Sequence, residues 1–318
     1  MASEFELIAR HFTRPAKTAA LGVGDDCALV QAPTGLALAI TTDMLVEGTH
    51  FLPGADAALL GHKTLAVNLS DLAAMGADPR WCTLALALPD ADDAWLAAFA
   101  NGFFALAERQ GIELIGGDTT RGPRTLCVTA LGTLPKGYAL RRDGAQPGDD
   151  LWLSGATGEA ALGLAHLQGR AALDGEHRDA CLARLHAPEP RVALGRRLRG
   201  IATAAIDLSD GLVADVGHIC ERSRVAADID DAAVPRAAAL AALADAGLAR
   251  ACVLAGGDDY ELAFTAPPEA RDAVARAGEL VRVPVTRIGR MREGAGVTVR
   301  DAAGAPLALD RPGYDHFR

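Results

Sequence analysis

The sequence predicts an α/β (α+β) protein that folds as two domains. Its 318 residues correspond to about two domains of average size. Half of the residues are hydrophobic, which is enough for a sizeable core and excludes a largely disordered chain. Short apolar runs alternate with segments of helical periodicity, and the polar, turn-rich stretch 135–150 interrupts this alternation once. We therefore expect an N-terminal domain over residues 1–137 and a C-terminal domain over residues 138–318.

The first half of the chain is expected to contain two helices and four strands. A helix over 92–110 is well marked, because apolar residues recur on one face, Asp92 or Asp93 can cap its start and Gly111 can end it. A second helix over 62–74 carries leucines at helical spacing. Apolar runs predict the strands 36–42, 83–88, 112–115 and 125–134.

The second half repeats the alternation after the turn-rich stretch. Apolar runs predict strands over 151–154, 203–208, 226–229, 260–265 and 285–288. Helical periodicity predicts helices over 159–168, 190–198, 211–222, 235–246 and 268–277. Each half therefore has its own helices and strands, as expected for two domains.

The charge balance excludes several classes of function. The chain has 31 Lys and Arg residues against 41 Asp and Glu residues, a formal net charge of −10. We expect neither a nucleic-acid partner nor an anionic membrane partner, because such proteins need a basic face. An acidic protein can still bind phosphate groups when its carboxylates hold Mg²⁺.

The cysteines and the hydropathy pattern predict a cytoplasmic protein. The six cysteines are widely spaced and include no CxxC pair, so we expect reduced thiols rather than a zinc site or a disulfide framework. No apolar run is long enough to span a membrane, and the first ten residues lack the apolar segment of a secretory signal.

Acidic residues beside Gly, Ser or Thr recur along the chain. Any one of them is an ordinary turn or capping residue, but Asp43, Asp71, Asp118 and Asp207 each follow an apolar stretch, so we expect each to end a buried element. Converging carboxylates repel one another unless cations neutralise them, and oxygen ligands without His or Cys favour Mg²⁺ or Mn²⁺ over zinc. The motifs are Gly24-Asp25-Asp26, Thr41-Thr42-Asp43, Ser70-Asp71, Gly116-Gly117-Asp118, Asp207-Leu208-Ser209-Asp210-Gly211 and Gly256-Gly257-Asp258-Asp259.

Several features suit phosphate binding, although neither a P-loop nor a GxGxxG motif is present. Gly116-Gly117 would let the backbone approach an anion, and Ser209 opens a predicted helix whose first N–H groups favour phosphate. Arg142, in the turn-rich stretch, is either a phosphate clamp or an exposed loop arginine. His50 is either a substrate contact or an ordinary loop residue.

Seven motifs in order resemble the thiamine-monophosphate kinase family over nearly the whole chain. A single motif would indicate only the wider superfamily of aminoimidazole-ribotide synthetase-like ATP enzymes. The third, fourth and last blocks below specify the kinase family when taken together. The motifs are GVGDDCA (22–28), ITTDMLVEGTHF (40–51), NLSDLAAMGADP (68–79), LIGGDTTRGP (114–123), AIDLSDGL (205–212), GGDDYEL (256–262) and GYDHF (313–317).

The resemblance implies a two-domain, aminoimidazole-ribotide synthetase-like fold. The N-terminal mixed-sheet domain would form a homodimer, and ATP would bind in the cleft beside the C-terminal α/β domain. The family's metal ligands correspond to Asp26, Thr41, Thr42, Asp43, Asp71, Asp118, Asp207 and Asp210. Its nucleotide contacts correspond to Gly117, Asp118, Arg142 and Ser209, and its substrate contacts to His50, Asp258 and Tyr314. Asp43, Asp71 and Asp118 are the expected catalytic residues.

Two positions depart from the family pattern. Relatives often have Glu where this chain has Asp258, which shortens the side chain by one methylene. Relatives can place an aromatic residue near the nucleotide where this chain has Asn101, so Asn101 is left out of the expected site.

The expected activity is ATP-dependent phosphorylation of thiamine monophosphate to thiamine diphosphate, the last step of thiamine diphosphate biosynthesis. The acceptor is already an ionised phosphate monoester and needs little general-base help, so Mg²⁺ on the carboxylates would mainly screen charge during in-line transfer. The alternatives are a related ATP enzyme acting on a formyl amidine, selenide or carbamoyl group, a silent metal–nucleotide binder, and a metal-dependent phosphohydrolase. A phospho-enzyme on His50 or an Asp is the alternative to direct transfer.

Overall fold

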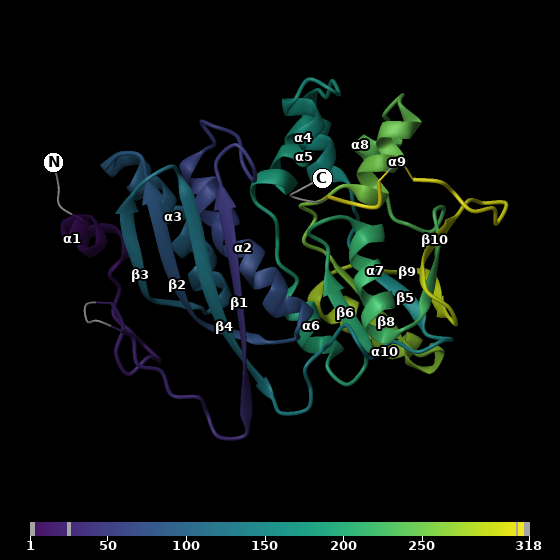
Figure 1. Cartoon of the computed structure of the whole chain (residues 1–318), viewed down its shortest axis with the longest axis horizontal. Helices are drawn as coiled ribbons and strands as arrows, with labels where there is room; N and C mark the ends of the chain where they lie inside the picture. Colours follow the sequence, from purple (N-terminus) through teal and green to yellow (C-terminus); the bar gives the residue numbers. More distant parts are fainter. Residues whose placement is uncertain (1–3, 24–26, 310, 315–318) are drawn as a thin grey trace. The chain divides into compact units, whose positions relative to one another are not determined.

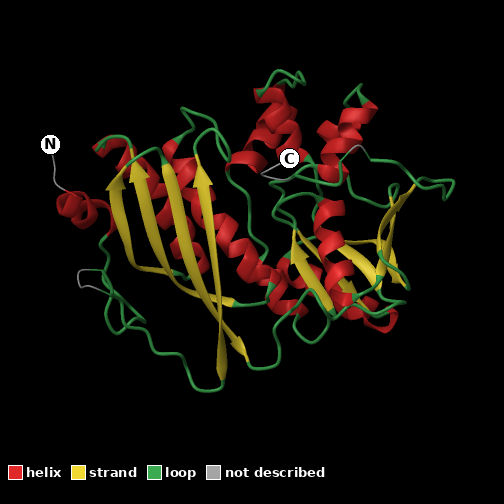
Figure 2. Ribbon diagram, in the orientation of Figure 1, coloured by secondary structure: helices red, strands yellow, loops and turns green. Residues whose placement is uncertain are grey.

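The computed structural model describes residues 4–23, 27–309 and 311–314 (Figures 1 and 2). The chain divides into two compact units. The N-terminal unit comprises Met1–Leu72 and Ala77–Gly137, and the C-terminal unit comprises Ala73–Gly76 and Tyr138–Arg318. Each unit combines helices with its own β-sheet, which confirms the expected α/β (α+β) class.

A four-stranded mixed sheet forms the N-terminal unit, in the order β1-β4-β2-β3. β2 and β3 are parallel, and the other neighbours are antiparallel. Two helices cover one face of this sheet (Figure 2), and α1 (Glu4–Leu7) with a π-helical turn (Ile8–Phe12) precedes it. The strands are β1 (Leu36–Val46), β2 (Asp78–Leu88), β3 (Glu113–Arg121) and β4 (Thr125–Pro135), and the helices are α2 (Ala57–Ala74) and α3 (Asp93–Gln110).

The helices α2 and α3 pack with their backbones in close contact. A Cβ atom at Gly102 of α3 would lie 1.8 Å from the carbonyl oxygen of Ala58, and one at Gly61 of α2 would lie 2.1 Å from that of Phe99. Glycine is therefore required at both positions for this approach. The caps predicted for α3 are confirmed: Asp92 accepts the N–H groups of Ala94 and Trp95, and Gly111 ends the helix in the left-handed conformation.

The C-terminal unit is built on a six-stranded sheet in the order β10-β7-β9-β5-β8-β6. All neighbours are antiparallel except the edge pair β10–β7. The centre of the sheet is apolar, with every residue of β5, β6 and β8 buried. The strands are β5 (Asp150–Ser154), β6 (Ala204–Asp207), β7 (Ala226–Asp230), β8 (Leu262–Ala266), β9 (Val285–Arg292) and β10 (Gly296–Arg300).

The helices of the C-terminal unit connect these strands. Leu162 of α4 and the apolar face of α7, which includes Leu212, Val216 and Ile219, belong to the core. The helices are α4 (Glu159–Leu167), α5 (Gly175–His186), α6 (Val192–Leu198), α7 (Leu212–Ser223), α8 (Ala238–Ala241), α9 (Ala246–Ala255) and α10 (Arg271–Val281), the last preceded by a 3-10 turn (Pro268–Ala270).

The prediction that Asp43, Asp71 and Asp118 each end an element is wrong. Asp43 lies inside β1, because Met44, Leu45 and Val46 continue to pair with β4. Asp71 lies in the last part of α2, and Asp118 lies inside β3, which continues beside β2 to Arg121. Only Asp207 ends its element, the strand β6.

The remaining findings concern cysteines and membranes. All six cysteines are free thiols, as expected. None of the helices in the described part of the chain is both long and apolar enough to cross a membrane.

Candidate active site

In the N-terminal unit, β1 and α2 bring Asp43 and Asp71 together. The Thr41 hydroxyl donates a hydrogen bond to Asp71 Oδ2. The backbone N–H of Asp43 donates to Asn68 Oδ1 at 3.1 Å, which ties the strand to the helix close to Asp71. Thr41 and Asp43 are two residues apart on one strand, so both side chains lie on the face that α2 covers.

The two carboxylates of this cluster repel each other. Burial, and then the negative charge of Asp71, raises the pKa of Asp43 to about 7. A divalent cation bound to these oxygens would remove the repulsion. The donors are carboxylate and hydroxyl oxygens, the ligand type that Mg²⁺ prefers, so the residues present fit Mg²⁺.

The cluster contributes only part of a metal site. Among the residues that the structure describes, no three His, Cys, Asp or Glu side chains lie close enough together to hold a metal ion. Asp26, an expected ligand, lies outside the described residues. The described part of the N-terminal unit therefore brings together Thr41, Asp43 and Asp71 from the expected set.

Thr42 and Asp118 lie on the other face of the sheet. Thr42 alternates with Asp43 along β1, and its hydroxyl is 2.8 Å from that of Thr129. Across the sheet, Asp118 of β3 pairs with Ala85 of β2, Ala85 pairs with Cys127 of β4, and Cys127 pairs with Met44 of β1. Paired residues point to the same face, so Asp118 lies on the open face with them. β1 and β3 are opposite edges of the sheet, about 14 Å apart at about 4.8 Å per strand. Within a single chain, Asp118 therefore lies far from the Asp43–Asp71 pair and on the opposite face of the sheet.

Gly117 is required by the packing of two strands. A Cβ atom here would lie 1.8 Å from the carbonyl oxygen of Leu84 on β2. We expected Gly117 to allow a nucleotide to approach the backbone. In the structure, however, the contact that excludes a side chain at this position comes from the neighbouring strand β2.

His50 follows β1 in a tight turn. The N–H of Val46 donates to His50 Nδ1 at 3.0 Å, and the N–H of His50 donates to the Val46 carbonyl at 2.9 Å. Because Nδ1 accepts a hydrogen bond, the neutral ring carries its proton on Nε2. That proton makes Nε2 a hydrogen-bond donor, which suits an anionic substrate group.

In the C-terminal unit, a buried carboxylate shapes the loop between β6 and α7. Asp215 in α7 accepts hydrogen bonds from the N–H groups of Asp210 at 3.1 Å and Gly211 at 3.0 Å. Burial, and then the charge of Asp210, raises the pKa of Asp215 to about 7. Asp207, at the end of β6, is also buried. The acidic loop is therefore held at its β6 end by Asp207 and at its α7 end by Asp215.

Two further segments are bonded to this loop and bring the expected residues together. The N–H of Asp258 donates to the Ser209 carbonyl at 2.9 Å, and that of Tyr314 donates to the Asp210 carbonyl at 2.9 Å. The glycines before them permit the approach, because a Cβ at Gly257 would lie 2.3 Å from the Ser209 carbonyl oxygen. Ser209, Asp210, Asp258 and Tyr314 thus form one site, although more than 100 residues separate the first from the last.

Arg142 belongs to the same neighbourhood, whereas Arg141 does not. The positive charge of Arg142 acts on the Asp215 carboxylate and partly offsets the rise in its pKa. Arg141 is exposed and forms an ion pair with Asp143, with Nε 2.9 Å from Oδ1.

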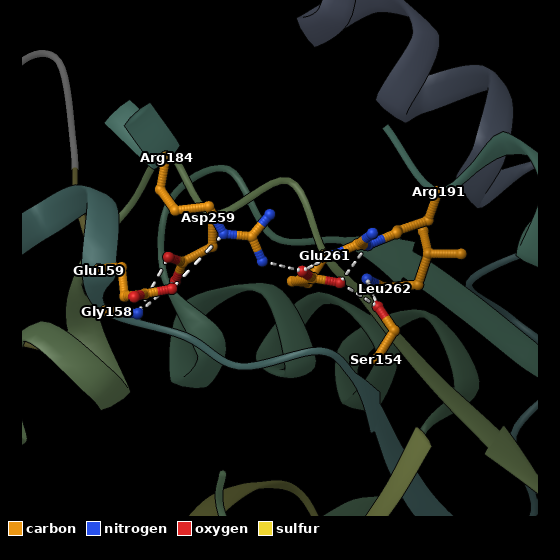
Figure 3. Close-up of polar contacts among 8 residues, drawn as sticks. All are labelled: Ser154, Gly158, Glu159, Arg184, Arg191, Asp259, Glu261 and Leu262. Carbon is orange, nitrogen blue, oxygen red and sulfur yellow. Dashed lines mark hydrogen bonds and ion pairs between the residues drawn. The ribbon is translucent and has the colours of Figure 1, made fainter. Parts of the chain in front are cut away.

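Arg184 and Arg191 surround the buried carboxylate of Glu261, which lies three residues after Asp258 (Figure 3). Glu261, fully buried, accepts hydrogen bonds from Arg184 at 2.7 Å, from Ser154 Oγ at 2.5 Å and from both Nε and Nη2 of Arg191, the former at 2.6 Å. The N–H of Leu262 donates to Ser154 Oγ at 2.8 Å. Two arginines and a hydroxyl satisfy the buried carboxylate, as a buried charge requires.

Asp259 anchors the same segment to the start of α4. Both of its carboxylate oxygens accept the N–H of Gly158, at 2.9 and 3.0 Å. Burial raises the pKa of Asp259 well above its usual range. The segment is therefore held at Asp259 and Glu261, on either side of Tyr260.

Sequence alone did not indicate the residues that hold the site in shape. These residues are Asp215, Tyr260, Glu261, Arg184 and Arg191. A signal existed for two of them, because Tyr260 and Glu261 lie in the GGDDYEL motif directly before an apolar strand. The arginines gave no signal, since they lie about 70 residues earlier among many charged residues.

Comparison with known proteins identifies relatives over the whole chain. The family description "AIR synthase related protein, N-terminal domain" matches residues 24–134, and "AIR synthase related protein, C-terminal domain" matches residues 146–302. The thiamine-monophosphate kinase of Salmonella typhimurium is 49% identical over 99% of this chain and 98% of its own. The thiamine-monophosphate kinase of Escherichia coli K12 is also 49% identical, with the same coverage.

Solved structures agree with these relatives. The crystal structure of thiamine-monophosphate kinase from Stenotrophomonas maltophilia is 52% identical with a TM-score of 0.84, covering 92% of this chain and 94% of its own. AaThiL complexed with AMPPCP and TMP is 31% identical with a TM-score of 0.79, covering 93% and 92%. The hydrogenase maturation protein HypE in complex with ATP, at 22% identity and a TM-score of 0.77, shares the fold.

Proposed function

The chain belongs to the thiamine-monophosphate kinases of the AIR synthase related family, and we propose that it passes the γ-phosphate of ATP directly to its acceptor at a site where carboxylates hold Mg²⁺. Its activity is ATP-dependent phosphorylation of thiamine monophosphate to thiamine diphosphate. The observation that carries the activity is 49% identity over 99% of the chain, together with a relative bound to an ATP analogue and TMP.

The proposed role of Mg²⁺ rests on the carboxylate cluster of the N-terminal unit. When bound, Mg²⁺ neutralises phosphate charge, which is the main obstacle when a phosphate oxygen approaches the γ-phosphate. Asp43 and Asp71 would be ligands of this cation, and the hydrogen bond from the Thr41 hydroxyl to the Asp71 carboxylate supports this proposal. Burial, and then repulsion from Asp71, raises the pKa of Asp43 to about 7, and a bound cation would favour the charged form of this carboxylate.

The proposed contacts for the organic substrates are the residues expected from the family resemblance. Ser209 and Arg142 would bind ATP phosphates, the serine from the loop that precedes α7 and the arginine through its planar guanidinium. Gly117 and Asp118 complete the expected nucleotide contacts. His50, through Nε2–H, Asp258 and Tyr314 would bind thiamine monophosphate. Asp207 and Asp210 would join the metal ligands, beside Asp26 and Thr42 from the expected set.

We propose that the chain acts as a homodimer joined through the open face of the N-terminal sheet. This face carries exposed apolar residues along the edge strand β1, with Leu38 at 40%, Ile40 at 62% and Met44 at 53% exposure. A row of exposed apolar side chains on an edge strand promotes aggregation in a monomer and is typical of a protein–protein interface. Residues 1–137 would then supply dimerisation and metal binding, and residues 138–318 the α/β partner domain. A cytoplasmic location agrees with the six free cysteines.

A product assay tests this proposal directly. The purified protein is incubated with ATP, Mg²⁺ and thiamine monophosphate, and we expect one thiamine diphosphate for each ADP. ADP without thiamine diphosphate would instead indicate a phosphohydrolase. Exchange of labelled ADP into ATP without thiamine monophosphate would contradict direct transfer, since it reports a phospho-enzyme. Thiamine is the control acceptor, and we expect poor turnover because its hydroxyl needs a general base.

A further inference from the structure

We propose that Tyr260 is a positioning residue for the recognition of thiamine monophosphate, acting through the carboxylate of Asp258. The Tyr260 hydroxyl donates a hydrogen bond to Asp258 Oδ1 at 3.0 Å. This bond fixes the rotation of the carboxylate and so the direction in which it accepts hydrogen bonds from a ligand. The inference rests on the proposed function, which places Asp258 among the substrate contacts.

The backbone around this pair is held in an unusual conformation. Asp258 and Tyr260 have φ angles of +68° and +50°, in the left-handed region that side chains other than glycine rarely adopt. The other two such residues in the described chain, Arg224 and Arg282, end helices, where this conformation is common. Strained backbone that does not end a helix clusters at functional sites, where the surrounding structure enforces it.

The surroundings explain how the strain is maintained. Asp258 and Tyr260 each donate their N–H to the β6–α7 loop, to Ser209 and Leu208 at 2.9 and 2.8 Å. Asp259 between them accepts the N–H of Gly158, and Glu261 after them is bound by two arginines (Figure 3). The side chains of Asp259 and Glu261 thus anchor the segment to the rest of the C-terminal unit. The Tyr260 ring between them is only 7% exposed, and its hydroxyl is directed at Asp258.

The consequence concerns specificity for the acceptor. Thiamine monophosphate carries a cationic thiazolium and an amino-pyrimidine, both of which an oriented carboxylate can recognise. An Asp258 carboxylate that has lost its hydrogen bond from Tyr260 would be less well oriented, which would weaken this recognition without affecting the phosphates of ATP. Tyr260 should therefore influence binding of the acceptor and leave the transfer step unchanged.

Tyr260→Phe tests the inference because it removes only the hydroxyl. We expect the KM for thiamine monophosphate to rise about three- to tenfold, as for the loss of one hydrogen bond, with kcat and the KM for ATP unchanged. Tyr138→Phe is the matched control: Tyr138 is 56% exposed, and its variant should behave as the wild type. Equal thermal stability of the two variants separates positioning from a folding defect.

A double-mutant cycle shows whether Tyr260 acts through Asp258. Asp258→Ala should also raise the KM for thiamine monophosphate, and adding Tyr260→Phe to it should have no further effect. An unchanged KM in Tyr260→Phe alongside a raised KM in Asp258→Ala would overturn the inference and leave the proposed substrate contact intact. Additive effects of the two substitutions would likewise overturn it. An unchanged KM in Asp258→Ala would overturn the contact itself, and the inference with it.

Discussion

Two neighbouring arginines near the start of the C-terminal unit, Arg141 and Arg142, have different surroundings. Arg141 is committed to an exposed ion pair with Asp143, whereas the charge of Arg142 acts on the acidic loop that contains Asp210 and Asp215. An exposed ion pair contributes little to stability, so Arg141 is dispensable on these grounds. Arg142 is placed to bind an anion beside Ser209.

Substitution of Arg142 tests its role as a phosphate clamp. Arg142→Lys should raise the KM for ATP about tenfold, because an ammonium group cannot form two parallel N–H bonds to phosphate, and Arg142→Ala should raise it further. The measurement is an ATP titration at fixed thiamine monophosphate and excess Mg²⁺. Arg141→Ala is the control and should be nearly silent. A larger effect from Arg141→Ala than from Arg142→Ala would show that the wrong arginine has been assigned.

At the scale of helices and strands, the sequence best predicts the elements whose ends carry capping residues. The helix α3 was predicted at both ends, because Asp92 caps it and Gly111 ends it. The helix α5 was not predicted, since only Cys181 and Leu185 are buried in an otherwise polar stretch. A single helix was predicted over 235–246, but the chain forms α8 and then α9. The stretch is rich in alanine, which favours helix throughout and marks no boundary. The start of α9 is set by Asp245, which accepts the N–H of Leu248. The edge strand β10 was also missed.

The crossing of α2 and α3 provides a prediction about packing. Gly102→Ala should lower the free energy of unfolding by about 1–3 kcal/mol, because the new methyl group meets the Ala58 carbonyl and the helices must move apart. Alanine is the better helix former, so any loss of stability reports this contact. Urea unfolding measures the change.

Gly217→Ala in α7 is the matched control for this packing prediction. The nearest atom to its Cβ is 4.0 Å away, so the substitution should stabilise the protein by about 0.5–1 kcal/mol. Equal effects at Gly102 and Gly217 would contradict the role of the helix crossing.

At the scale of the whole molecule, the candidate site was predicted only in part. The residue types pointed to metal and phosphate chemistry, and the resemblance to a family supplied the positions. The sequence could not show that Asp258 and Tyr314 meet Ser209 and Asp210, because backbone hydrogen bonds between distant segments create that site. Nor could it show that strand alternation separates Asp43 from Asp118, because the faces of a sheet depend on register.

This separation leads to a proposal about the dimer. Asp43 faces the helices from the edge strand β1, whereas Asp118 lies on the open face of β3, the opposite edge. A homodimer joined through the open faces would bring Asp118 against the second copy, in which Asp43 lies on an edge strand, β1. We therefore propose that Asp118 of one copy serves the site that contains Asp43 of the other.

Mixing two inactive variants tests this proposal. Asp43→Asn and Asp118→Asn should each lose about 10²-fold or more in kcat, because each removes a proposed ligand of the Mg²⁺ that screens phosphate repulsion. Unfolding and refolding them together in equal amounts gives mixed dimers, in which one site carries both substitutions and the other carries neither. Random pairing should then restore about a quarter of the wild-type activity, since half the dimers are mixed and half of their sites are intact. Asp43→Asn mixed with Asp71→Asn is the control and should stay inactive, because β1 and α2 of one chain supply both residues. No recovery in the first mixture would place Asp118 in the site of its own chain. Recovery in the control would contradict the assignment of Asp43 and Asp71 of one chain to the same site.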